Sequence, residues 1–278
     1  MVKRAHGPWT HMRRPKPGEG CGTNHDERGD SMRNTELEHI INQKLNSNAV
    51  EDYAPNGLQV EGRQEVQRIV TGVTACQALL DSALAHGADA VIVHHGYFWK
   101  NEAPVISGMK RRRLKTLLAN DINLYAWHLS LDAHPELGNN AQLAAALDIR
   151  VTGALEPLLP QGELATPLSG AALRLRLEHT LGRSVLHCGD GGPAQISRLA
   201  WCTGGGQGFI ELAAQAGVDA FITGEVSEQT IHVAREQGLH FYAAGHHATE
   251  RGGIRALGEW LTQQYDLDVT FIDIPNPA

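Results

Sequence analysis

An internal repeat constrains the fold of this 278-residue chain more than any other feature of its sequence. Residues 69–95 read IVTGVTACQALLDSALAHGADAVIVHH, and residues 199–225, about 130 positions later, read LAWCTGGGQGFIELAAQAGVDAFITGE without a gap. Gly87 and Asp89 of the first copy align with Gly217 and Asp219 of the second. Each copy has the pattern of a strand, a turn containing glycine, an amphipathic helix, a glycine stop and a buried strand. This pattern is typical of a βαβ unit, whose strands are parallel and whose crossover is right-handed.

A second helix and strand are expected after each copy, at residues 111–119 and 122–127 in the first and at residues 228–236 and 239–244 in the second. The sequence therefore predicts an α/β fold of two similar, pseudo-symmetric halves with mainly parallel sheets and flanking helices. We place the first half at residues 32–150 and the second at residues 151–278. A stretch rich in Pro and Gly, residues 154–195, is expected to join the repeats and to hold one helical pattern at residues 173–181.

The chain begins with a different kind of segment. Residues 1–31 are rich in Pro, Gly, Arg and His and lack periodicity, which predicts a flexible extension or a misplaced start codon with Met32 as the natural beginning. Folding is expected to begin at residues 34–46, where apolar side chains recur at helical spacing. Thr35 followed by Glu38 forms a capping-box pattern at the start of this helix.

Composition narrows the classes of function. The formal net charge of −7 argues against a broad nucleic-acid surface, which normally carries a basic excess. No apolar run approaches the roughly 18 residues that span a bilayer. The four cysteines form no CxxC pair and no disulfide framework, and they are typical of reduced thiols in a cytosolic protein. We therefore expect a cytoplasmic protein that binds neither nucleic acid nor membrane.

Polar side chains gather where the predicted strands end. His94 and His95 end a buried strand, Asp132 follows the next strand, and His246 and Glu250 follow the last strand of the second copy. In open parallel sheets, ligands bind beyond the carboxyl ends of the strands. Each signal also has an ordinary structural interpretation: core histidines for the pair, a helix N-cap for Asp132, and a surface pair for His246 and Glu250. For Asp132 that interpretation is weakened, because the following helix has caps of its own in Asn139 and Asn140.

Three imidazoles and two carboxylates at one place predict a metal site. This set of ligands suits Zn, Fe, Mn or Ni better than calcium, which prefers oxygen alone. Five protein ligands are too many for one catalytic ion with an open position, so we expect two divalent ions about 3.5–4 Å apart, bridged by a carboxylate or a hydroxide. Asp132 and Glu250 are equal candidates for the bridge. His128, Glu225 and His247 are expected to orient ligands or to move protons, with His134 and His232 as weaker candidates.

Three further patterns have competing interpretations. The run from Thr203 to Gly208 (TGGGQG) opens a helix and could hold a phosphate, but Phe209 breaks the nucleotide fingerprint, which favours a tight turn that allows close packing. The basic run at residues 110–115 is expected to be a solvated face, with attraction of a phosphorylated substrate as the alternative. We expect Trp99, Trp127 and Trp201 to lie in the core or at an interface.

Five segments carry a family resemblance: DYAPNGLQVEG (52–62), VIVHHGYFWK (91–100), LSLDAHPELGNN (129–140), ITGEVSEQ (222–229) and AAGHHATERGG (243–253). They resemble the YbgI-like dinuclear metal proteins, a family named GTP cyclohydrolase type I, type 2 homologues. The resemblance runs from about residue 32 to residue 278 and implies a two-metal site made by His94, His95, Asp132, His246 and Glu250. It also implies a ring-shaped homohexamer whose metal sites face an internal cavity, and a GTP ring-opening activity. Residues 1–31 have no place in the pattern, and residues 154–195 are too few for the middle domain of longer members.

Three functions remain open at this stage. The first is a metal-dependent hydrolase that acts on a nucleotide-like or phosphorylated small molecule. The second is a metal-binding assembly without turnover, such as a metallochaperone, a stress-related factor or a scaffold. The third is a di-iron oxidoreductase, which requires a redox-active metal.

Overall fold

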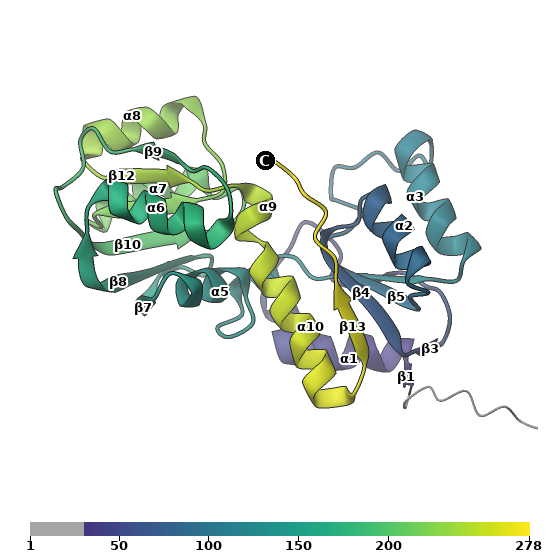
Figure 1. Ribbon diagram of the computed structural model, residues 1–278. Coiled ribbons are helices and arrows are strands. Elements are labelled where there is room, and N and C mark those ends of the chain that lie inside the picture. Colours follow the sequence, from purple (N-terminus) through teal and green to yellow (C-terminus); the bar gives the residue numbers. More distant parts are fainter. Residues whose placement is uncertain (1–30) are drawn as a thin grey trace, which may run out of the picture.

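The computed structural model describes residues 31–278, which form two α/β lobes joined through a long helix (Figure 1). The first lobe contains a five-stranded sheet in the order β13-β4-β5-β6-β2. Its strands are β13 (Asp268–Phe271), β4 (Arg68–Thr74), β5 (Ala90–His95), β6 (Asn123–Ala126) and β2 (Gly57–Val60). The first four are parallel, and β2 pairs antiparallel with β6.

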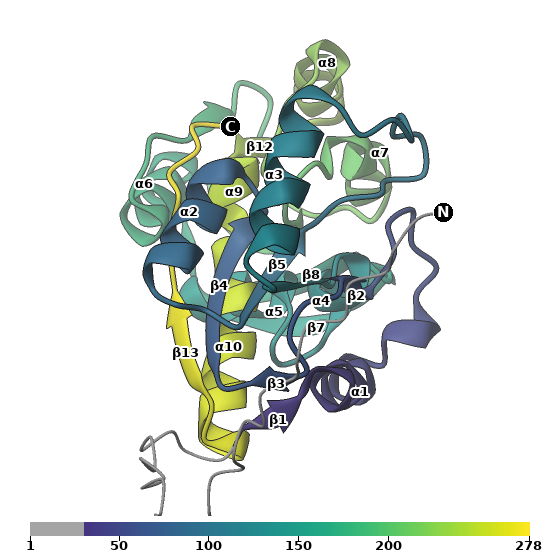
Figure 2. The same cartoon turned by 90° about the vertical axis from the view of Figure 1, so that its right-hand side faces the viewer.

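Helices cover both faces of this sheet (Figures 1 and 2). On one face lie α2 (Gln77–Ala85) and α3 (Gly108–Ala119), whose apolar side chains pack with Val91 and Val93. On the other face lie α1 (Asn34–Leu45) and α10 (Arg251–Tyr265), which pack with Ile92. Successive residues of β5 alternate between the two faces, and helices cover both faces, so this strand is buried on both sides. Its polar residues, His94 and His95, lie at its carboxyl end.

The second lobe contains a six-stranded sheet in the order β7-β8-β10-β11-β12-β9. Its strands are β7 (Ile149–Glu156), β8 (Leu159–Leu168), β10 (Ile196–Cys202), β11 (Ala220–Thr223), β12 (His240–Ala243) and β9 (Leu186–Cys188). Only β10, β11 and β12 are parallel, and the outer strands join antiparallel. Helices α5 (Asn139–Ala146) and α6 (Gly170–Leu181) cover one face, and α7 (Ile210–Gln215) and α8 (Glu228–Gln237) cover the other. The α/β class is therefore confirmed, with a second sheet more mixed than predicted.

Residues 154–195, expected to join the two repeats with one helix, also form strands of the second sheet. These residues supply the end of β7, all of β8 and β9, and helix α6, which includes the expected helical pattern at residues 173–181. Strand β8 pairs with β10, and β9 pairs with β12, so the segment extends the second sheet at both edges. Pro160, Gly162 and Pro167 lie within β8, and because such residues are depleted in strands, composition concealed this one.

The two copies of the repeat form the same unit with the same contacts. Strands β4 and β5 are parallel around α2, as are β10 and β11 around α7, which confirms the predicted βαβ units. In the first copy, one oxygen of Asp89 accepts backbone N–H groups of residues 67 and 68 at 3.0 and 2.9 Å. In the second copy, Asp219 accepts those of residues 197 and 198, both at 2.8 Å. Gly87 and Gly217 both have positive φ, +63° and +69°, where the helix turns back into the sheet.

The end of the chain returns to the first lobe. Strand β13 pairs with β4, aligning Asp268 with Arg68, and α10 packs across the same sheet. A short helix, α9 (His246–Thr249), precedes α10 and lies at the second lobe. The division of the chain at residue 150/151 stays a prediction, and the structure adds that β13 belongs to the first sheet and that α10 packs on it. No helix of the described residues is long and apolar enough to cross a membrane.

The start of the described chain corrects one local prediction. Strand β1 (Met32–Arg33) pairs with β3 (Glu65–Val66), and α1 begins at Asn34 without a side-chain cap from the residue before it. The capping-box prediction is wrong, because Thr35 lies inside the helix and Glu38 accepts the backbone N–H of Leu58 at 2.8 Å. The predicted extension lies outside the described residues except for Ser31.

Candidate metal centre

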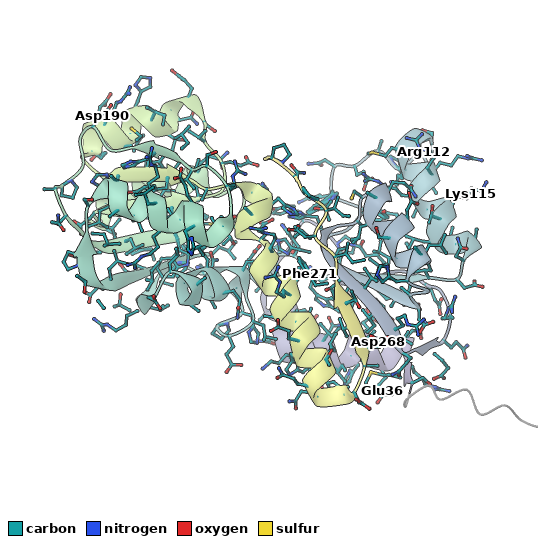
Figure 3. All side chains as sticks on the ribbon, in the orientation of Figure 1. Glu36, Arg112, Lys115, Asp190, Asp268 and Phe271 are labelled. Atoms are coloured by element: carbon teal, nitrogen blue, oxygen red, sulfur yellow. The ribbon has the colours of Figure 1, made fainter. Side chains whose placement is uncertain are left out.

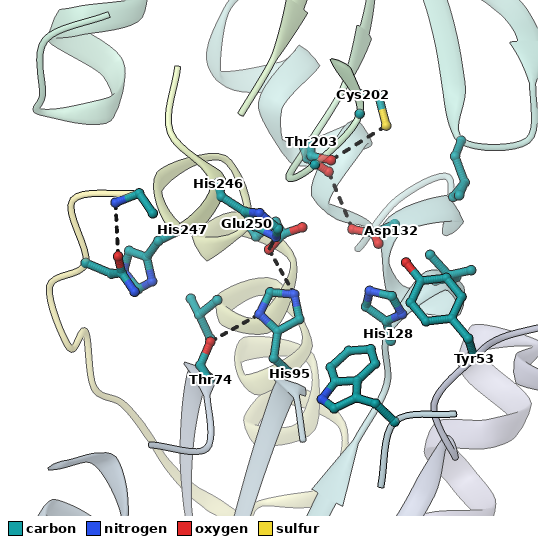
Figure 4. A pocket seen from close by; sticks show the side chains of 18 of the residues that line it. Tyr53, Thr74, His95, His128, Asp132, Cys202, Thr203, His246, His247 and Glu250 are labelled. Carbon is teal, nitrogen blue, oxygen red and sulfur yellow. Dashed lines mark hydrogen bonds and ion pairs between the residues drawn. The ribbon is translucent and has the colours of Figure 1, made fainter. Parts of the chain in front are cut away.

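The five predicted ligands lie at or just beyond the carboxyl ends of strands and converge between the lobes, and Figure 4 shows His95, Asp132, His246 and Glu250. His94 and His95 end β5, Asp132 lies in the short helix α4 (Leu129–Ala133) after β6, and His246 begins α9. Glu250 lies between α9 and α10. Two groups of three predicted ligands each place their donor atoms within 4.8 Å of one another: His94, Asp132 and Glu250, and His95, His246 and Glu250. A third such group joins His94 and His95 to His128.

Glu250 is the carboxylate common to both groups. Its Oε1 lies 3.4 Å from Nε2 of His94, and its Oε2 lies 3.2 Å from Nε2 of His95 and 3.2 Å from Nε2 of His246. Asp132 reaches only His94, at 3.5 Å. Sequence spacing could not separate the two carboxylates, whereas the structure places Glu250 between imidazoles from both lobes.

The three imidazoles are oriented by contacts at their other ring nitrogen. Nδ1 of His94 donates to the carbonyl of Trp127 at 3.0 Å, and Nδ1 of His246 donates to the carboxylate of Glu225 at 2.6 Å. Nδ1 of His95 lies 3.1 Å from the hydroxyl of Thr74. Contacts of this kind fix the ring plane and direct Nε2 to the centre, as partners of metal-bound histidines commonly do.

Two buried atoms of the centre have no hydrogen-bond partner within the described part of the chain. They are Nε2 of His94, whose residue is 0% exposed, and Oε2 of Glu250, whose residue is 3% exposed. An unsatisfied buried polar atom costs free energy, and a cation between such atoms removes that cost. The donor set, its burial and these unpaired atoms all fit a bound metal ion.

The electrostatics of the centre also favour a cation. Burial disfavours a charged ring at His94, but the carboxylates of Asp132 and Glu250 outweigh burial and raise the pKa of His94 to about 9. Burial and the neighbouring charge of His94 lower the pKa of His95 to about 3. The carboxylate of Glu250 raises the pKa of His246 to about 9 against the effect of burial. Without a metal ion, protons must therefore supply the positive charge that the buried carboxylates require.

The glycine run after β10 packs closely against this centre. Gly204 has φ +70°, and a Cβ at this position would collide with the carboxylate of Glu250. Its N–H donates to the hydroxyl of Thr249 at 2.9 Å, which ties the run to α9. This arrangement agrees with the interpretation of the run as a tight turn for close packing.

One local prediction beside Asp132 is wrong. Asn139 and Asn140 do not cap their own helix, because Gly138 is the N-cap and makes no side-chain cap. The amide of Asn139 instead donates to Asp132 and accepts the N–H of Gly253, both at 2.8 Å. Helix α9 ends at Thr249 with Glu250 as its C-cap, and α10 then runs from Arg251 through Gly252 and Gly253. A Cβ at Gly253 would collide with Asn139, so glycine lets α10 approach α5.

The remaining predicted residues separate into two groups. His128 borders the centre, Glu225 holds His246, and His247 makes a 2.7 Å ion pair with Asp273 at its edge. His134 and His232 lie apart from the centre, where they contact the carbonyl of Lys44 and the carboxylate of Glu228.

Sequence reasoning missed three residues beside the centre: Asp52, Tyr53 and Trp99. Burial raises the pKa of the Asp52 carboxyl, but hydrogen bonds from His128 and Asn56 outweigh burial and hold that pKa below its usual range. Trp127 and Trp201 are fully buried as predicted, whereas Trp99 lines the cavity. The run DYAPNG (52–57) could have indicated Asp52 and Tyr53, since it combines a carboxylate and an aromatic residue in a turn.

A cavity of about 710 Å³ opens over the centre, a size typical of small-molecule sites. Its lining comes from both lobes and from the C-terminal segment: Tyr53, Val73, Thr74, His95, Trp99, His128, Leu129, Asp132, Leu158, Cys202, Thr203, Gly205, Gly206, Phe209, His246, His247, Glu250, Asn276 and Ala278.

The fold and this site define an α/β protein whose two sheets enclose a cluster of histidines and carboxylates that could hold metal ions. Comparison with known proteins identifies the family. The family model of Duf34/NIF3 (NGG1p interacting factor 3) matches residues 32–277, and the chain belongs to this family.

Individual relatives agree with the family and with the resemblance found in the sequence. A protein of Escherichia coli (strain K12) named GTP cyclohydrolase 1 type 2 homolog is 75% identical over 247 residues, which cover 89% of this chain and 100% of the relative. A solved structure described as protein ybgI, unknown function, is 75% identical with a TM-score of 0.88, and the match covers 89% of this chain and 100% of that one. The structure of TTHA1606 from Thermus thermophilus is 35% identical with a TM-score of 0.82, at the same coverage.

Proposed function

We propose that the chain holds two divalent metal ions, one at His94, Asp132 and Glu250 and the other at His95, His246 and Glu250. Glu250 is the bridging carboxylate in this arrangement, and Asp132 is a ligand of one ion. Nitrogen and oxygen donors of this kind suit Zn, Fe, Mn or Ni. The observation that carries the proposal is the position of the buried Glu250 carboxylate, within 3.4 Å of three imidazole nitrogens.

We further propose that the centre makes the protein a hydrolase of a nucleotide-like or phosphorylated small molecule. A pair of such ions polarises the substrate and supplies a nucleophile from water near neutral pH. Among the chain's own residues, His128 lines the cavity, and its Nδ1 is bound to Asp52 at 2.9 Å. The relatives' name, GTP cyclohydrolase 1 type 2 homolog, agrees with a substrate of this class.

The test begins with metal analysis of the purified protein by mass spectrometry, followed by assays of purine nucleotides and phosphoesters with added Zn, Mn or Fe. We expect turnover that a chelator removes, and we expect Asp132→Ala to abolish it. Turnover that persists in Asp132→Ala would contradict the assignment of this centre as the reaction site. Identification of the metal also addresses the di-iron alternative, which requires iron.

A metal-binding assembly without turnover is the second candidate, and an apolar patch favours it. Val105, Ile106 and Met109 are 68%, 58% and 56% exposed where the chain enters α3. Exposed apolar side chains that cluster in this way often mark contacts between proteins. A homo-oligomer, with the ring-shaped hexamer as the form that the family resemblance implies, would cover them. A full metal content and a hexameric mass by light scattering, without chelator-sensitive turnover, would support this candidate over the hydrolase.

A further inference from the structure

Three aromatic rings stand together at one side of the cavity, and we call Tyr53, Trp99 and His128 the aromatic wall. The centroids of Tyr53 and Trp99 lie 5.9 Å apart, and those of Trp99 and His128 lie 5.0 Å apart with planes at 87°. Trp99 is also 6.0 Å from the ring of His95. Figure 4 shows Tyr53 and His128 next to one another and close to Asp132, with Glu250 further away. The wall therefore borders the metal centre directly.

Hydrogen bonds hold the wall in place although its members come from three separate segments. The N–H of Lys100 donates to the carbonyl of Tyr53 at 2.8 Å, which joins the segments that carry Tyr53 and Trp99. The carboxylate of Asp52 binds both Nδ1 of His128 and the N–H of Leu129 at 2.9 Å. A wall built in this way is preorganised, so a ligand would not have to order it.

The wall offers apolar ring surface that the chain itself does not cover. Tyr53 is 53% exposed although its ring borders a cavity. Trp99 also lines the cavity and is only partly buried. Open aromatic faces beside polar groups bind planar rings by stacking, and this binding tolerates different rings because each has a π-face.

The charged groups of the cavity limit the net charge that such a ligand can carry. Among the described residues, no side chain that lines the cavity is a lysine or an arginine. The basic run of α3 does not line the cavity, and Figure 3 shows Arg112 and Lys115 at the outer surface of the first lobe. Two divalent cations would bring four positive charges, of which Asp132 and Glu250 neutralise two. The remaining charge suits a hydroxide and one anionic group, not a triphosphate.

We propose that this cavity binds a planar aromatic heterocycle with at most one negative charge, stacked on the aromatic wall with a polar atom toward the metal centre. The inference rests on the proposed metal-dependent function and narrows its substrate class to bases and nucleosides. A polyphosphate adds little to binding, because apart from the metal centre neither the wall nor the rest of the lining offers it a cation.

The first test compares probes that share a ring and differ in charge. Isothermal titration of the zinc-loaded full chain uses guanosine, GTP, adenosine, ATP and tripolyphosphate, with metal content measured before and after each titration. We expect each nucleoside to bind at least as tightly as its triphosphate, and tripolyphosphate alone not to bind. The inference is overturned if a triphosphate binds more than about tenfold tighter than its nucleoside, a difference of about 1.4 kcal/mol. It is also overturned if neither nucleoside binds.

The second test removes the wall. Trp99→Leu is expected to weaken nucleoside binding about tenfold, as loss of one stacking side chain does elsewhere, and Trp99→Phe should restore most of it. Phe98→Leu is the matched control, since Phe98 is 38% exposed and does not line the cavity. Should Trp99→Leu misfold, Tyr53→Leu provides the same comparison. Unchanged binding in a folded wall variant would overturn the inference.

Failure of the inference differs from failure of the proposed function. A protein without bound metal, or without turnover, contradicts the proposed hydrolase whatever the titrations give. A metal-loaded protein that ignores nucleosides, or prefers triphosphates, contradicts only the assignment of the ligand.

Discussion

The two copies of the repeat share a backbone and differ in chemistry. Both form a βαβ unit with an aspartate, Asp89 or Asp219, that holds the start of the first strand. The first copy ends its second strand with two of the candidate ligands, His94 and His95, whereas the second copy ends at Glu225, which orients His246. The first copy thus supplies two candidate ligands itself, whereas the second copy supplies a residue that orients a candidate ligand. Glu250 lies between the candidate histidines of both lobes.

The strongest test of this comparison is to remove Glu250, whose carboxylate lies near candidate histidines of both lobes. Glu250→Ala is expected to abolish binding of both ions, because its carboxylate lies within 3.4 Å of imidazoles from each lobe. The loss of affinity should exceed the roughly 10- to 100-fold typical of losing an outer partner. Metal content by mass spectrometry measures it, and retention of one ion would show that Glu250 serves a single site.

The next comparison is between the contacts that orient the histidines of the two lobes. Glu225→Gln should weaken metal binding about 10- to 100-fold, because a charged acceptor 2.6 Å from His246 is replaced by a neutral one. Thr74→Val should have a smaller effect, since a hydroxyl 3.1 Å from His95 is a weaker partner. Competition with a chromogenic chelator gives both affinities. Equal effects would mean that the charge of Glu225 does not matter.

The paired aspartates test whether the copies are equivalent in stability. Asp89→Ala should destabilise the fold by about 2 kcal/mol, because it leaves two backbone N–H groups unpaired and Asp89 is only 7% exposed. Asp219→Ala should cost about 1 kcal/mol, because this residue is less buried. Urea unfolding followed by circular dichroism measures the difference. A larger loss for Asp219→Ala would reverse the expected order.

The smallest expected effect concerns two buried tyrosines at matching places in β6 and β12, the strands that follow the βαβ unit in each lobe. Tyr125 donates to the carbonyl of Asn34 at 2.9 Å, and Tyr242 donates to that of Gly170 at 2.8 Å. Burial raises the pKa of both hydroxyls, so the folded chain favours their neutral form. Their contribution to stability is therefore present below the ordinary pKa near 10 and is lost as pH rises beyond it.

Phenylalanine variants measure what the hydroxyl of each tyrosine contributes to stability. Tyr125→Phe and Tyr242→Phe should each cost about 1 kcal/mol at pH 7, the net value of one hydrogen bond. Each variant should also lose less stability than the parent between about pH 10 and pH 12, since it has one fewer group to ionise. Thermal unfolding across this range is the measurement, and parallel curves for parent and variants would contradict the assignment.

Local sequence patterns predicted the strands and turns, because these depend on short segments of the chain. The apolar runs before His94 and His246 and the glycines at 87 and 217 marked the strands and turns, so the five candidate ligands could be placed at strand ends. The role of Asn139 could not be predicted in this way, because it depends on α10 reaching α5 across more than a hundred residues. Likewise, Asp52 lies far from the candidate ligands in the chain, and only folding brings it, together with Trp99, to His128.

The sequence by itself determined the α/β class, the βαβ units and the kinds of donor at their ends, because hydrogen-bond ladders and alternating burial are properties of short segments. Only the tertiary structure decided that Glu250 rather than Asp132 lies among all three imidazoles, that β13 completes the first sheet, and that an aromatic wall borders the cavity. These features depend on the packing of elements distant in the chain, where a glycine such as Gly253 or Gly204 sets how closely two backbones approach.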